Sequence, residues 1–136
     1  MDIITIASST IALLTPYLAK AGEEVTKKAF GAAWEKVNEI HKAIKERLAQ
    51  EKDKYPKETL ERFEQEPEKR KHAMQEMLTE ILEKDSVFSQ KLEDLLKDAD
   101  KAGVGTVFNT NIFGGEVGEV INIDTIQQDL NINKKK

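Results

Sequence analysis

Apolar residues recur at three- and four-residue steps over most of the first hundred residues, which predicts a series of amphipathic helices. The first predicted helix runs from about Ile3 to Ala21, with Asp2 placed to cap it and Pro16 placed to bend it. Gly22 marks a break, and a long second helix follows over residues 23–51. Its apolar stripe consists of Phe30, Trp34, Val37, His41, Ile44 and Leu48.

Three shorter helices are expected next. The polar segment around Pro56 predicts a loop, and Lys57 to Gln65 predicts a short helix with Leu60 and Phe63 on one side. Pro67 fits the first turn of a helix that ends near Lys84, with buried positions at Met74, Met77, Leu78, Ile81 and Leu82. Asp85 or Ser86 is placed to cap a last helix with Phe88, Leu92, Leu95 and Leu96 on its inner face. The predicted fold class is mainly α, an antiparallel bundle of four to five helices over residues 1–101.

The pattern changes after Lys101 to a Gly/Asn/Val-rich tail over residues 102–133, followed by a basic terminus at 134–136. Val104 to Phe113 and Val117 to Ile126 read as two strands, and Gly114 and Gly115 suit the turn between them. A lone pair of strands is marginally stable in water. The β-hairpin-like tail therefore needs the bundle, a second copy of the chain or a stack of copies.

Two forms of assembly fit this tail. Residues 106–115 contain no proline and no charge, and the amides of Asn109 and Asn111 suit ladders between identical stacked strands. Against stacking, in-register strands would bring copies of Glu116, or of Glu119, close together. The alternative is a hairpin that pairs edges with a second copy or folds back on the helices. Stacking of tails and edge pairing with a second copy would both make the chain a homo-oligomer.

The run from Ile3 to Ala19 is nearly uncharged, which makes it a candidate membrane element. It lacks the basic flank of a secretory signal, and its hydroxyl side chains and Pro16 place it at the short and polar limit for a bilayer span. A buried bundle helix is the first interpretation and membrane contact the second. The candidate membrane residues are Ile3, Ile4, Ile6, Ile11, Leu13 and Leu14.

The net charge and the residue types present argue against several classes of function. A net charge of -4 and a pI near 5.3 argue against general nucleic-acid binding, and the chain has no cysteine. His41 reads as a half-buried, satisfied imidazole and His72 as a solvated one, while Glu76 and Glu80 fit a helix face. We find no catalytic constellation, so we predict neither an enzyme nor a bound cofactor or metal. Trp34 is expected to anchor the core.

The segments IITIASSTIALLTPYLAKAGEEV and AFGAAWEKV, the helix-rich middle and the tail NTNIFGGEVGEVINID together resemble a group of small cyanobacterial and actinobacterial proteins. The resemblance implies a HeLo- or Bell-like helical domain with a RHIM-like amyloid signalling motif. The nearest match to the RHIM-like core is Gly115 to Gly118. The resemblance implies assembly through Asn111, Phe113, Gly115, Val117 and Gly118, to which the strand pattern adds Phe108, Asn109 and Ile121.

The resemblance also implies a function. It is that of a signalling effector in bacterial defence or regulated cell death, templated by an NLR-type receptor with a similar tail. Such an effector would be cytoplasmic and would reach membrane lipid on activation, when the first helix leaves the bundle. The alternative is a structural or adaptor protein that oligomerises through its C-terminal hairpin.

Overall fold

The computed structural model describes residues 1–20, 31–108 and 110. Its elements are α1 (Ile3–Ala19), α3 (Ala32–Leu48), α4 (Tyr55–Gln65), α5 (Pro67–Lys84), α6 (Ser86–Lys101) and α7 (Val104–Val107). No residue within these described ranges is assigned to a strand. The mainly helical fold is therefore confirmed, and the second predicted strand lies outside the described residues.

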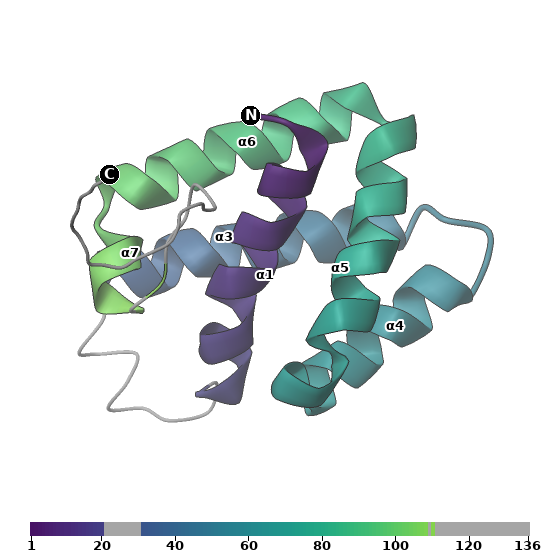
Figure 1. Cartoon of the computed structure of the whole chain (residues 1–136), viewed down its shortest axis with the longest axis horizontal. Helices are drawn as coiled ribbons and strands as arrows, with labels where there is room; N and C mark the ends of the chain where they lie inside the picture. The colour runs from purple at the N-terminus through teal and green to yellow at the C-terminus, as the bar shows by residue number, and fades with distance from the viewer. Residues whose placement is uncertain (21–30, 109, 111–136) are drawn as a thin grey trace, which may run out of the picture.

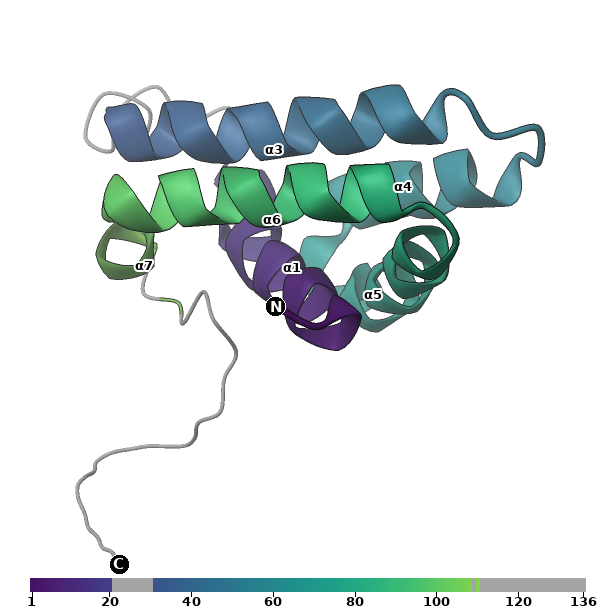
Figure 2. The ribbon, with the colours of Figure 1, turned by 90° about the horizontal axis from the view of Figure 1, so that it is seen from above.

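The helices form two crossed layers. α3 and α6 run side by side, and α1 and α5 cross beneath them (Figure 2). α1 packs most extensively against α5, which also holds α4, while α7 packs on α3 and α6 (Figure 1). This arrangement places α1 at the centre of the bundle, where it contacts α3, α5 and α6.

The predicted helix signals act largely as expected. The Asp2 carboxylate accepts a hydrogen bond from the Thr5 backbone N–H at 2.7 Å, and the Asp85 carboxylate accepts one from the Phe88 N–H at 3.0 Å. Pro67 occupies the first turn of α5. The loop predicted around Pro56 is wrong at that residue, because α4 begins at Tyr55 and accommodates Pro56 in its first turn. The predicted helix start near residue 23 lies outside the described residues.

The apolar stripes converge on one core. The five predicted positions of α5 and the Leu60 and Phe63 side chains of α4 are all buried. Val104 and Phe108 belong to the same core, with 0% and 5% of their surfaces exposed. The bundle packing therefore continues past Lys101, the expected domain boundary, to Phe108.

Candidate functional site

The predicted membrane residues of α1 are mostly core residues. Ile6, Ile11, Leu13 and Leu14 are at most 4% exposed, whereas Ile3 is half-buried and Ile4 is 69% exposed. A helix with such a buried apolar face gains most of its stability from packing. Among the described residues, no helix combines the length and the apolar character needed to cross a bilayer. In this state α1 is a structural helix of the bundle.

Two buried hydroxyl groups of α1 donate hydrogen bonds to the backbone of the same helix, and a third does not. Thr10 and Thr15 donate hydrogen bonds to the carbonyl oxygens of Ile6 and Ile11, each at 2.7 Å. Buried Ser9 finds no hydrogen-bond partner for its hydroxyl among the described residues. Half-buried Ser8 also donates to the Thr5 carbonyl oxygen, at 3.3 Å. The helix backbone thus satisfies three of the hydroxyl groups that weakened a membrane prediction.

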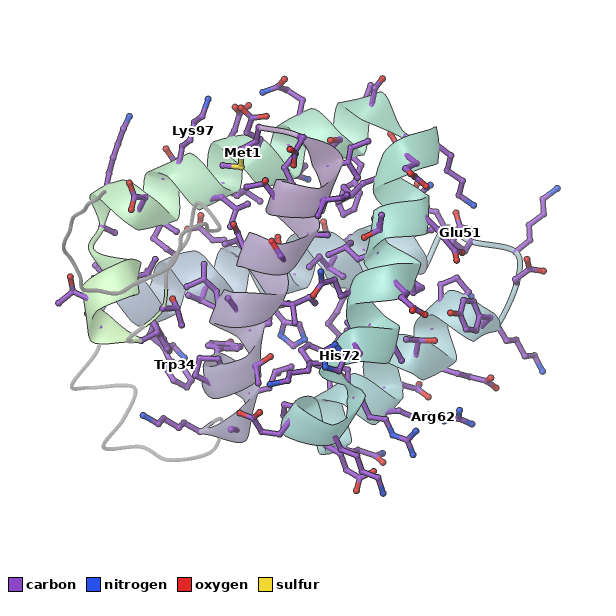
Figure 3. All side chains as sticks on the ribbon, viewed as in Figure 1. Met1, Trp34, Glu51, Arg62, His72 and Lys97 are labelled. Carbon is purple, nitrogen blue, oxygen red and sulfur yellow. The ribbon has the colours of Figure 1, made fainter. Side chains whose placement is uncertain are left out.

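Three aromatic rings connect α1, α3 and the residue after α7. Trp34 of α3 lies 4.6 Å from Tyr17 of α1 and 6.3 Å from Phe108, measured between ring centroids. Figure 3 shows Trp34 in the region between α1 and α7. Trp34 is 6% exposed, so its predicted role as a core anchor is confirmed. We call these three residues the aromatic bridge.

Polar groups surround one end of the aromatic bridge. The Tyr17 phenol donates a hydrogen bond to the Asn38 side-chain oxygen at 2.9 Å, and its ring lies edge-on to His41 at 5.8 Å. Burial raises the pKa of the Tyr17 phenol, and the charge of Glu35 adds to the rise. The phenol therefore stays a neutral donor at physiological pH.

The two histidines lie in different environments. His41 Nε2 is 2.7 Å from Glu64 Oε2 on α4, and Lys45 Nζ lies 3.8 Å from the same oxygen. The prediction of a half-buried imidazole with a partner is confirmed for His41, and His72 is exposed as expected. Within residues 1–20, 31–108 and 110, no cluster of three or more His, Cys, Asp or Glu side chains is placed to hold a metal ion.

The predicted assembly residues fall on both sides of the described boundary. Phe108 is buried in the aromatic bridge, and the other seven lie outside the described residues: Asn109, Asn111, Phe113, Gly115, Val117, Gly118 and Ile121. The strand predicted from Val104 is wrong over its first four residues, which form α7. Gly103, with φ of 82°, makes the left-handed turn that lets α7 fold back onto α3.

Sequence reasoning missed this helical turn. Val104 and Phe108 are four residues apart, a spacing that places both on one helix face, but a short apolar run fits a strand equally well. Trp34, which lies far away in the sequence, supplies the surface on which the helical form packs.

Comparisons of the chain with family models, with curated proteins and with solved structures found no match.

Proposed function

We propose that the chain is a non-enzymatic signalling effector, in which assembly of the C-terminal tail is transmitted to the helical bundle. The observation that carries the proposal is the aromatic bridge. Phe108 belongs to the predicted assembly motif, yet it packs against Trp34, which in turn packs against Tyr17 of α1. One side chain thus links the tail to the bundle.

The link works by competition between two backbone conformations. In the bundle, the Val107 and Phe108 N–H groups donate to the carbonyl oxygens of Gly103 and Val104 at 3.1 and 2.8 Å. A strand that begins at Val104 needs these same backbone groups for its ladder and turns alternate side chains to opposite faces. Growth of a β-assembly through Phe108 would therefore unwind α7 and withdraw Phe108 from the core.

Withdrawal of Phe108 would act next on α1. Trp34 would lose its packing contact with the Phe108 ring, and this loss would loosen the packing of Trp34 against Tyr17 near the end of α1. A loosened α1 carries the buried residues Ile6, Ile11, Leu13 and Leu14, which suit a lipid surface or an apolar partner. In this proposal an NLR-type receptor with a similar tail starts the assembly by adding a strand.

A reconstitution tests this function. A preassembled peptide of residues 102–133 is added to the full-length chain in the presence of dye-loaded vesicles that contain anionic lipid. We expect dye release only when chain and assembled peptide are both present. A peptide of scrambled sequence is the matched control. Recruitment of the chain onto the assembled peptide without any dye release would contradict the effector function.

The alternative is an adaptor whose tails merge while the bundle stays intact. The deep burial of most of α1 favours it, because releasing that helix would dismantle the core. If the chain is an adaptor, tail assembly should leave the environment of Trp34 unchanged. Since Trp34 is the only tryptophan of the chain, its fluorescence emission separates the two functions.

A further inference from the structure

The connection between α3 and α4 projects from the end of the bundle that lies opposite α7 (Figure 1, Figure 2). Tyr55, at the start of α4, is 53% exposed, whereas every other Phe, Trp or Tyr side chain that the structure describes is buried. The first turn of α4 fixes the backbone here, because the Glu58 N–H donates to the Lys54 carbonyl oxygen at 2.9 Å. We call residues 52–57, which contain this ring, the projecting segment.

The acidic residue that precedes the projecting segment is neutralised by the bundle. Arg47 donates a hydrogen bond to the Glu51 carboxylate at 2.7 Å, and Lys84 donates one at 3.0 Å. The Glu51 side chain is 15% exposed, and Figure 3 shows it near the start of the connection. Since two cations of the bundle already neutralise this carboxylate, it does not offset the lysines that follow it.

The projecting segment itself is basic. Its three lysines are exposed, and none forms an ion pair with a residue that the structure describes: Lys52, Lys54 and Lys57. Asp53 is the only acid of the segment, so three lysines and one acid give it a net charge of +2, on a chain whose net charge is -4. A local excess of positive charge beside an exposed aromatic ring suits an anionic partner that also offers apolar contact.

We propose that the projecting segment docks the closed bundle onto an anionic lipid surface. Each lysine near such a surface strengthens binding roughly fivefold. A tyrosine ring is favoured at the boundary between headgroups and acyl chains, because its body is apolar and its tip is polar. A segment that projects reaches a flat surface before the rest of the bundle does. Salt screens charges beyond about 8 Å, so the acidic bundle behind the segment adds little repulsion.

This docking rests on the proposed function, in which released α1 reaches lipid. It adds the surface by which the closed chain is held at the membrane before that release. The docking contacts involve neither α1 nor the tail, and the segment lies at the opposite end of the bundle from α7 (Figure 1). Docking and release can therefore be measured separately.

Flotation of the full-length chain with vesicles, without any assembled peptide, tests the charged contact. We expect binding to vesicles of phosphatidylcholine with phosphatidylserine and none to phosphatidylcholine alone. Lys54→Gln/Lys57→Gln should lower the partition coefficient at least about tenfold. The control Lys42→Gln/Lys91→Gln removes the same charge from exposed lysines of α3 and α6, and should lower it less than about twofold. No binding to the phosphatidylserine vesicles, or equal losses in the two variants, would overturn the proposal.

A second pair of variants tests whether the partner is lipid. Tyr55→Ser should lower the partition coefficient at least about threefold, whereas Val87→Ser, at an 80% exposed position of α6, should leave it unchanged. If Tyr55→Ser binds as the unaltered chain does, the contact is electrostatic only and the assignment to lipid is wrong. Vesicle binding that persists without dye release in the reconstitution would refute the effector function and leave the docking intact.

Discussion

Removal of the Phe108 ring should open α7 without unfolding the bundle. Burial of Val104 and Phe108 contributes roughly 3 to 6 kcal/mol in total, and the α7 hydrogen bonds add about 1 kcal/mol each. Ordering residues 103–108 costs about 1 to 2 kcal/mol for each residue. These opposing contributions nearly cancel, so the closed and open forms of α7 differ little in free energy. Loss of the Phe108 ring should shift that equilibrium towards the open form.

The assay compares Phe108→Ala with Phe63→Ala, which removes a fully buried ring from α4. Phe63→Ala should lower the free energy of unfolding by about 3 to 5 kcal/mol. Phe108→Ala should lower it by no more than about 1 to 2 kcal/mol, because only the opening free energy of α7 can be lost. Urea unfolding measures both. Native-state hydrogen exchange should show lost protection in α7 and a smaller loss around Tyr17 at the end of α1, with the rest of the bundle unchanged.

A particular outcome would refute this reasoning. If Phe108→Ala destabilises the whole bundle as much as Phe63→Ala does, α7 unfolds together with the core. Tail assembly could then not unwind α7 separately.

Three further predictions concern other contacts. Gly103→Ala should destabilise the turn before α7 by about 1 kcal/mol or more, because a side chain is strained at a φ of 82° even though the added Cβ would meet open space. Gly103→Asn should destabilise the turn less, and hydrogen exchange of α7 should detect both effects. A chain ending at Thr110 should keep the thermal midpoint of the full-length chain, whereas one ending at Lys101 should melt lower and expose Trp34, because Val104 and Phe108 are gone. The Phe88 backbone N–H and then Arg47 hold the pKa of Asp85 below its usual range, and Arg47 does the same for Glu51. Both ionised carboxylates therefore stabilise the fold fully at neutral pH, and this contribution is lost in acid below about pH 4.5. Urea unfolding should show that the free energy of unfolding falls less in acid for Arg47→Met than for the unaltered chain.

The bundle could be predicted from sequence because its signals are local. The buried positions Met74, Met77, Leu78, Ile81 and Leu82 follow directly from helical spacing, and the caps at Asp2 and Asp85 follow from residue type. These features depend on neighbours within one or two helical turns. A single sequence contains that information.

The candidate site could be predicted only in part because its contacts are long-range. The sequence indicated that His41 would have a partner but not that the partner is Glu64, and it gave Tyr17 no role. The competition between helix and strand at Val104 to Phe108 depends on Trp34, more than sixty residues earlier in the chain. The interpretation of residues 111–133 as part of a β-forming tail stays a prediction.

Trp34 emission during tail assembly tests the central claim most directly. The full-length chain is mixed with the preassembled peptide of residues 102–133 in the absence of vesicles, and emission is followed together with thioflavin fluorescence. The account predicts a shift of Trp34 emission to longer wavelength that rises with the thioflavin signal, because Phe108 leaves the aromatic bridge and water reaches the indole. A full thioflavin response with unchanged Trp34 emission would contradict it and would leave the adaptor function in its place.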